Sequence, residues 1–138
     1  MHTNIYLYFS GNLEQAFEYY RDHLGGEILM LSRYKDIPMP AEHKPQGWDD
    51  KVMHGRIKLG DAIIMGSDVK REQERPMQAF DLVANTDTAE EAERVFKALA
   101  DGGAVSMPLT ETFFAVRYGS LKDRFGVPWS VSCEKPMQ

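Results

Sequence analysis

This 138-residue chain has a single cysteine, no long apolar run, and fewer basic than acidic residues. The lone Cys133 excludes an intramolecular disulfide, and its place at the end of a strand-like run predicts a buried thiol rather than a nucleophile. No apolar stretch approaches the roughly 18 residues of a membrane-spanning helix. The first residues have neither the basic region nor the apolar run of a signal peptide. We therefore expect a cytoplasmic protein without a membrane partner.

The charge balance also argues against a nucleic-acid partner. Lys and Arg number 16 against 21 Asp and Glu, which gives a net charge of −5, and the basic residues form no cluster. Hydrophobic residues make up 43% of the chain and charged residues 27%, as in ordinary globular proteins. The length fits one domain, or two small modules that share a core.

Two parts of the chain share one pattern: a strand, a capped amphipathic helix, a glycine pair, then further strands. The first helical pattern begins at Asn12 and ends at Gly25–Gly26, and the second begins near Thr88 and ends at Gly102–Gly103. Two copies of a half-built sheet bury their faces most simply against each other. We predict an α+β fold of two tandem βαβββ modules. The first spans residues 1–67, the second spans 78–138, and residues 68–77 link them.

The predicted elements follow from periodicity and turn residues. Helices are expected after Asn12 and after Asp87 or Thr88, and strands over 3–10, 27–34, 51–59, 62–67, 78–85, 104–107, 113–118 and 128–133. Asn12 with Gln15 matches a capping box, as does Asp87 or Thr88 with Glu90 or Glu91. Residues 3–10 are apolar on both faces, so this strand is expected to be buried on both. Pro108 is expected to end a strand.

Residues 51–59 alternate in a way that suggests a ligand-facing surface. Met53, Ile57 and Leu59 suit a helix-packed face, which leaves His54 and Arg56 pointing into a sheet concavity. A histidine and an arginine two residues apart on one face can meet an anionic or carbonyl ligand. The simpler alternative is a solvated strand face whose histidine bonds a neighbour. The long loop 36–50, with Trp48, has the length of a lid or binding loop.

Four segments together resemble a known family: Phe9–Asn12, Val52–His54, Glu111–Phe114 and Lys122–Ser130. With the repeat and its glycine pairs, they resemble the PhnB-like (YjdN-type) branch of the vicinal oxygen chelate superfamily. This superfamily also holds glyoxalase I, bleomycin-resistance proteins and extradiol dioxygenases. The resemblance spans nearly the whole chain. It implies paired βαβββ modules that form a cupped, mostly antiparallel eight-stranded sheet, commonly assembled as a homodimer.

The resemblance also indicates where a metal would bind. Metal-dependent members place His, Glu or similar ligands at four strand positions, which align here with Ile5, with Ile64 or Met65, with Asp81 and with Ser130. A divalent metal needs several converging N, O or S donors, and isoleucine supplies none. The resemblance therefore implies that the usual ligand set is largely lost, and we assign no resident metal or cofactor.

Three functions remain open. The first is binding of a small, anionic or oxygen-rich molecule in the sheet concavity by His54, Arg56, Asp81, Glu111 and Arg117, with Trp48 from the loop. The alternative is a metal-dependent isomerase, lyase or dioxygenase with a displaced site around His54 and Glu111, where a divalent metal acts as Lewis acid. A purely structural role is the third.

Each candidate residue also has a structural interpretation. Asp81 can bond backbone at a strand end, Glu111 can be a turn residue and Arg117 an exposed strand cation. Phe114 and Trp129 are expected in the core rather than as stacking platforms. Methyl transfer, a label sometimes attached to this branch, is not expected. Its nucleotide-binding folds need a glycine-rich turn before a helix, whereas these glycine pairs follow the helices.

Overall fold

The computed structural model describes residues 1–70 and 75–136. Its contacts divide the chain into two compact units, Met1–Arg75 and Pro76–Gln138. In the first unit the elements are β1 (Ile5–Phe9), α1 (Leu13–Leu24), β2 (Glu27–Arg33), β3 (Val52–Leu59) and β4 (Ala62–Asp68). In the second they are β5 (Leu82–Asn85), α2 (Ala89–Ala100), β6 (Ala104–Thr110), β7 (Ala115–Lys122) and β8 (Pro128–Glu134). Of the predicted linker 68–77, residues 71–74 lie outside the described residues.

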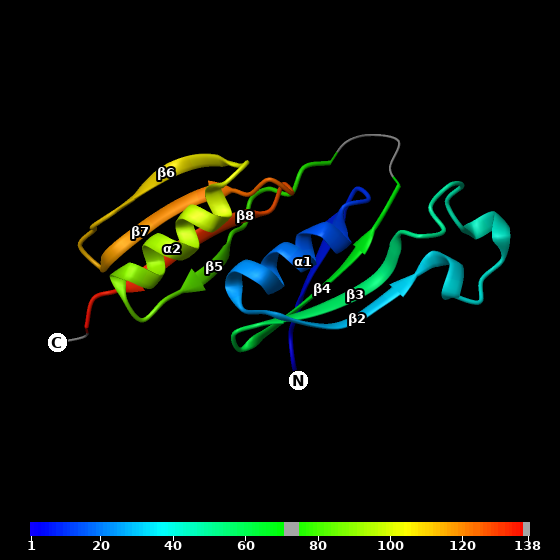
Figure 1. The fold of residues 1–138 in the computed structure, drawn as a ribbon, viewed down its shortest axis with the longest axis horizontal. Coiled ribbons are helices and arrows are strands. Elements are labelled where there is room, and N and C mark those ends of the chain that lie inside the picture. The colour runs from blue at the N-terminus through cyan, green and yellow to red at the C-terminus, as the bar shows by residue number, and fades with distance from the viewer. Residues whose placement is uncertain (71–74, 137–138) are drawn as a thin grey trace. The chain divides into compact units, whose positions relative to one another are not determined.

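Each unit folds its strands into one four-stranded sheet with the same topology. The strand order is β1-β4-β3-β2 in the first unit and β5-β8-β7-β6 in the second. The first strand pairs in parallel with the last, and the other two pairings are antiparallel. One helix lies across one face of each sheet (Figure 1). The predicted α+β duplication is confirmed, with its eight strands divided between two mixed sheets.

Both cores lie between a helix and its sheet. In the first unit the buried apolar side chains include Leu7, Phe9, Leu13, Phe17, Tyr20, Ile57 and Ile64; in the second they include Ala92, Val95, Leu99, Leu121, Trp129 and Val131. A Cβ on Gly55 would lie 3.1 Å from side-chain atoms of both Leu13 and Phe17. Glycine at this position therefore lets α1 approach the middle of the sheet closely.

The glycine pairs end both helices, as predicted. Gly25 and Gly102 have φ values of 74° and 77°, the left-handed conformation that glycine adopts without a steric penalty. The second glycine of each pair has another role, because a Cβ on it would meet a strand carbonyl. That carbonyl belongs to Lys58 for Gly26 and to Lys122 for Gly103. The sequence pattern thus reflects one helix stop and one close approach.

The N-terminus of α1 is capped differently from the prediction. Asn12 makes no side-chain capping hydrogen bond, so the expected capping box with Gln15 is wrong. The carboxylate of Asp68, at the end of β4, takes that role: its Oδ1 accepts from the main-chain amides of Gly11 and Leu13, each at 3.0 Å. A full negative charge at a helix N-terminus also complements the helix dipole.

The cap of α2 is local, as predicted. The Thr88 hydroxyl accepts from the Glu91 amide at 3.1 Å, and the Glu91 carboxylate accepts from the Asp87 amide at 3.4 Å. These reciprocal bonds satisfy two amides that the helix itself leaves unpaired.

We expect Thr88→Ala to lower the free energy of unfolding by about 1 kcal/mol, because it removes this cap. Asn12→Ala should change it by less than about 0.5 kcal/mol, since Asp68 holds the first amide of α1. Urea denaturation followed by circular dichroism measures both. Equal losses from the two variants would contradict the assignment of the caps.

Four further strand predictions differ from the structure. β5 runs over Leu82–Asn85 rather than 78–85. Tyr8 on β1 is exposed and Tyr6 half-buried, so β1 is buried on one face only. Pro108 does not end β6, because β6 is the edge strand of its sheet and its register with β7 shifts between Met107 and Thr110. An edge strand tolerates a residue that cannot donate to a ladder. β7 runs over 115–122 rather than 113–118.

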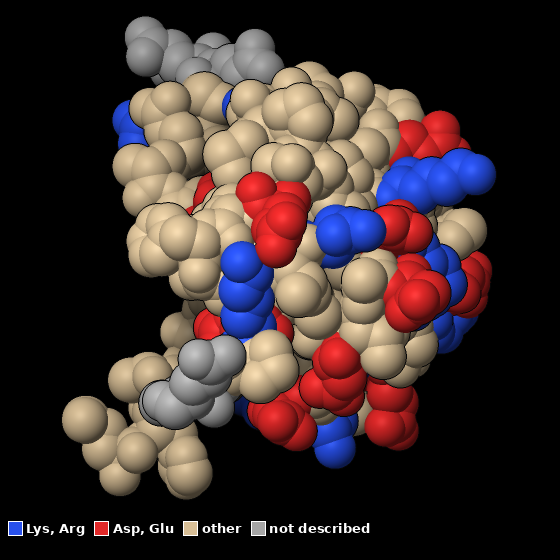
Figure 2. Space-filling view, turned by 90° about the vertical axis from the view of Figure 1, so that its left-hand side faces the viewer, with Lys and Arg blue, Asp and Glu red and all other residues tan. Residues whose placement is uncertain are grey.

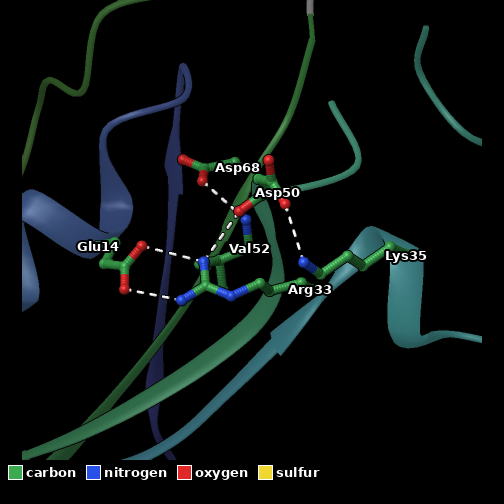
Figure 3. A network of polar contacts seen from close by, with 6 residues as sticks. All are labelled: Glu14, Arg33, Lys35, Asp50, Val52 and Asp68. Carbon is green, nitrogen blue, oxygen red and sulfur yellow. Dashed lines mark hydrogen bonds and ion pairs between the residues drawn. The ribbon is translucent and has the colours of Figure 1, made fainter. Parts of the chain in front are cut away.

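The loop between β2 and β3 packs beside the start of α1. Its hydrogen bonds include the Lys51 ammonium donating to the Gly11 carbonyl at 2.7 Å. The tip of the Trp48 ring would lie 3.7 Å from a Cβ on Gly11. Arg33 donates from both Nη atoms to the Glu14 carboxylate at 2.9 and 2.8 Å (Figure 3). That hydrogen bond lowers the pKa of Glu14. These hydrogen bonds hold the β2–β3 loop and the start of α1 together at this end of the sheet.

Cys133 is buried, as expected for a structural thiol. Within the residues described, neither helix has the length or apolar character to cross a bilayer. On the side shown in Figure 2, acidic and basic side chains lie next to one another rather than in separate fields.

Candidate functional site

The face of the first sheet opposite α1 carries most of its polar side chains. The register pairs Tyr6 with Met65, Tyr8 with Ser67 and Arg56 with Met65. Paired residues share a sheet face, and successive residues alternate between faces. Because Leu7, Ile57 and Gly66 face α1, these five residues and His54 face the other way. We call this surface the open face of the first sheet.

His54 lies at the centre of a hydrogen-bonded row on the open face. Its Nδ1 is 2.9 Å from the hydroxyl of Tyr6 on β1, and its Nε2 accepts from Arg56 Nε at 3.3 Å. The ring centroids of Tyr6 and His54 lie 5.6 Å apart, and those of Tyr6 and Tyr8 5.2 Å apart. His54 therefore reaches across β4 to β1, since β4 lies between β1 and β3 in the sheet.

Burial and neighbouring charge perturb both ends of the His54–Tyr6 contact. Burial raises the pKa of Tyr6, with a further contribution from Tyr8, while a hydrogen bond with Ser67 partly offsets the rise. Burial lowers the pKa of His54, and the Arg56 guanidinium lowers it further. Both shifts favour the neutral side chain. Tyr6 and His54 thus form an uncharged pair beside one exposed cation, Arg56.

The face of the second sheet opposite α2 carries a different polar group. Ser130 on β8 donates to the Asp81 carboxylate at 2.6 Å, and the Tyr118 hydroxyl donates to Ser130 Oγ at 3.4 Å. The Phe114 ring packs edge-on against Tyr118, with centroids 5.1 Å apart. This group ends in a carboxylate, whereas the group on the first sheet ends in a guanidinium.

The two groups occupy equivalent positions in the duplicated fold. Gly55 pairs with Gly66 in the first sheet, and Gly119 pairs with Val131 in the second. His54 directly precedes Gly55, just as Tyr118 directly precedes Gly119. Duplication has therefore given one strand position two chemistries, an imidazole in the first unit and a phenol in the second.

The other predicted site residues lie elsewhere. Glu111, just after β6, pairs with Lys135 at 3.1 Å, and it belongs to the second unit whereas His54 belongs to the first. Arg117 pairs with Glu93 of α2 at 3.3 Å, so its side chain lies on the helix-covered side of its sheet. Trp48 lies near Gly11. The structure thus brings His54 and Arg56 together, and it places Arg117 away from the open face.

Sequence reasoning missed Tyr6, Ser67 and Tyr118 as members of these groups. The only available signal was the tyrosine pair at positions 6 and 8, which two-residue alternation puts on one face of a strand. This tyrosine pair indicates a polar surface only if one face of β1 is known to be uncovered. Phe114 is 41% exposed rather than in the core, whereas Trp129 is buried, with its indole N–H donating to Asp123 at 2.9 Å.

Among the described residues, no three His, Cys, Asp or Glu side chains gather closely enough to hold one metal ion. The residues that stand at the superfamily's ligand positions are accounted for by other contacts. Ile64 is in the core, Ile5 pairs with it in the β1–β4 ladder, and Ser130 bonds Asp81.

The fold is shared with known structures of low sequence identity. A glyoxylase/bleomycin resistance protein/dioxygenase domain from Frankia sp. EAN1pec matches with a TM-score of 0.69 at 13% identity, over 98% of both chains. Two units of one helix and four strands each thus define a glyoxalase-like protein of the vicinal oxygen chelate fold.

More similar proteins identify the family. A family model described as 3-demethylubiquinone-9 3-methyltransferase matches residues 2–132. Protein YjdN of Escherichia coli (strain K12) is 34% identical over 137 residues, covering 94% of this chain and 93% of YjdN. Protein PA1353 from Pseudomonas aeruginosa is 40% identical with a TM-score of 0.84, covering 98% of this chain and 100% of that one. A PhnB protein from Bacillus cereus is 30% identical with a TM-score of 0.80, over 96% and 99% of the two chains.

The chain therefore belongs to the PhnB-like family of the vicinal oxygen chelate superfamily, the branch that includes YjdN.

Proposed function

We propose that this protein binds a small, anionic or oxygen-rich molecule on the open face of the first sheet. The observation that supports the proposal is the row Tyr6–His54–Arg56, in which a neutral, hydrogen-bonded pair lies beside an exposed guanidinium. An exposed cation held by its neighbours has lost part of its conformational freedom before a ligand arrives, which lowers the entropic cost of binding. The half-exposed Tyr8 ring offers an apolar surface next to the charge.

The donor set does not fit the metal centre of the superfamily's metal-dependent members. Ile5 and Ile64 carry no donor atom, Met65 offers only a thioether, and the Ser130 hydroxyl is engaged by Asp81. Hard divalent cations prefer oxygen ligands such as carboxylates, and transition metals such as zinc, iron and nickel also bind imidazole. We therefore route no step of the function through a metal at these positions.

Two other functions have less support. A displaced metal site around His54 and Glu111 would have to break the Arg56–His54 and Lys135–Glu111 contacts. Methyl transfer is the activity in the name of the family model, and the Bacillus cereus relative is named as a candidate for it. In each unit, however, the turns that precede the helices are Gly11–Asn12 and Thr86–Thr88, neither of which is a glycine-rich nucleotide loop. We infer binding rather than methyl transfer.

A ligand screen by nuclear magnetic resonance tests the proposal. We would add carboxylates, phosphate esters, neutral polyols and simple aromatic compounds to ¹⁵N-labelled protein. The expected result is that at least one class shifts the amide signals of Tyr6, His54 and Arg56 in a saturable way. Arg56→Gln should weaken that binding about tenfold or more, because it removes charge-assisted hydrogen bonds.

Arg117→Gln is the matched control, since it makes the same chemical change at an arginine that pairs with α2. It should leave the affinity within about twofold. If no class of compound shifts the open-face signals, the proposed function is wrong.

A further inference from the structure

Two hydrogen bonds on the open face join into one row. It runs from Arg56 Nε to His54 Nε2, and from His54 Nδ1 to the Tyr6 hydroxyl. Arg56 and His54 lie on β3 and Tyr6 lies on β1, so the row reaches across β4, the strand between them.

The guanidinium end of the row fixes its direction. A guanidinium N–H can only donate. His54 Nε2 must therefore be unprotonated, and a neutral imidazole then carries its hydrogen on Nδ1. That N–H donates to the Tyr6 hydroxyl. Both hydrogen bonds therefore point from the guanidinium toward Tyr6.

This direction determines which groups remain for a ligand. An arginine has two edges that can grip an anion, one formed by Nε and Nη2 and the other by Nη1 and Nη2. His54 occupies Nε, which leaves the edge of two Nη groups. Among the described residues these groups have no hydrogen-bond partner, and Arg56 is exposed.

We propose that Arg56 binds an oxyanion, such as a carboxylate or a sulfate- or phosphate-like group, end-on through Nη1 and Nη2, with His54 as the positioning residue that orients the guanidinium. The proposal rests on the proposed function and names the ligand group that the open face recognises. Two parallel charge-assisted hydrogen bonds to two oxygens of one anion give this contact both strength and direction. Arg56 recognises the charge of the ion and two of its oxygens, which all oxyanions share. The residues around Arg56 therefore determine which class of oxyanion binds most tightly.

The first measurement needs no ligand. Long-range ¹H–¹⁵N spectra at pH 8 report which ring nitrogen of each histidine is protonated. His54 is expected to show Nδ1–H with unprotonated Nε2, and the exposed His2, His23 and His43 serve as references in the same spectrum. An Nε2–H tautomer for His54 would overturn the proposal, because that ring cannot accept from Arg56.

The second measurement titrates the protein at pH 8 with acetate and, separately, with sulfate, two anions whose charge is constant near this pH. Binding should shift the Arg56 side-chain signals, and the stronger of the two anions identifies the preferred geometry. Arg56→Gln should weaken binding at least tenfold. Lys58→Gln, which removes a charge from the same strand, should weaken it less than threefold.

A third comparison separates positioning from simple packing. His54→Leu should weaken oxyanion binding severalfold, and His54→Gln, whose amide oxygen can again accept from Arg56, should restore part of the loss. Equal affinity of wild type and Arg56→Gln for both anions would overturn the proposal, as would equal effects of the two His54 variants. If polyols or aromatic compounds bind the open face while neither anion does, the oxyanion assignment fails but the proposed function stands.

Discussion

Asp68→Asn is expected to lower the free energy of unfolding by about 3 kcal/mol, although it changes one atom. The carboxylate is only 1% exposed. Its Oδ1 accepts from the amides of Gly11 and Leu13, and its Oδ2 accepts from the amide of Val52 at 3.0 Å (Figure 3). It therefore joins the turn before α1 to the start of β3.

The physical reason is the loss of an acceptor at a buried donor. With asparagine in place, one oxygen can still accept from Gly11 and Leu13, but the amide nitrogen faces the Val52 N–H. Two donors then meet, and the Val52 amide is left unsatisfied. A buried unsatisfied donor costs about 1–3 kcal/mol, and the remaining bonds lose the charge that strengthened them.

Urea denaturation followed by circular dichroism measures the loss, and hydrogen exchange locates it. The amides of Leu13 and Val52 should lose protection in the variant. Asp61→Asn, the same substitution at the exposed β3–β4 turn, is the control and should change stability by less than about 0.5 kcal/mol. A loss below about 1 kcal/mol for Asp68→Asn would show that the carboxylate does not have this role.

Gly103→Ala is expected to destabilise the second unit by about 3 kcal/mol. A Cβ at this position would overlap the Lys122 carbonyl oxygen and lie 3.0 Å from the Asp123 Cα. Both obstacles are main-chain atoms, so the methyl group fits only if β6 moves away from β7. Overpacking of this kind typically costs 1–3 kcal/mol, and a collision with backbone belongs at the upper end.

Gly26→Ala is the matched variant, because Gly26 occupies the equivalent place in the first unit. There the nearest atom is Leu59 Cδ2 at 2.5 Å, at the end of a movable side chain, and the Lys58 carbonyl is 3.1 Å away. We expect about half the loss or less. Thermal denaturation of both variants measures the difference. If Gly26→Ala proves the more harmful of the two, the steric account is wrong.

The repeated pattern in the sequence was sufficient to predict the fold. In each glycine pair the first glycine is a left-handed helix stop and the second lies close to a strand. Pairs at nearly the same spacing from two similar helices therefore indicated duplicated units. The Thr88 cap was predictable for the same reason, since its partners lie within four residues.

Features that depend on distant residues were not predictable from local patterns. The cap of α1 comes from Asp68, more than fifty residues along the chain from Leu13. Asn12 is a favourable capping residue by type, yet the carboxylate occupies that position. Similarly, Pro108 breaks a strand only where its missing donor is needed, and the edge position of β6 removes that need.

The candidate site was predictable only in part. Alternation along β3 correctly placed His54 and Arg56 on the face away from Ile57. Their partner Tyr6 lies on β1, which joins the sheet through β4, so its contact with His54 depends on strand order. Arg117 is the opposite case, a predicted site residue that lies elsewhere. An arginine suits an anion site, but the register of β7 directs this side chain toward Glu93 of α2.

The source of each helix cap also has a consequence for the order of folding. The first turn of α2 can be satisfied by Thr88 and Glu91 as soon as that short segment coils, so this helix can nucleate from its own sequence. The first turn of α1 is satisfied only after the β3–β4 hairpin has docked and delivered Asp68. We therefore expect two halves with one architecture to assemble by different routes, one starting from a local helix turn and one from a long-range contact.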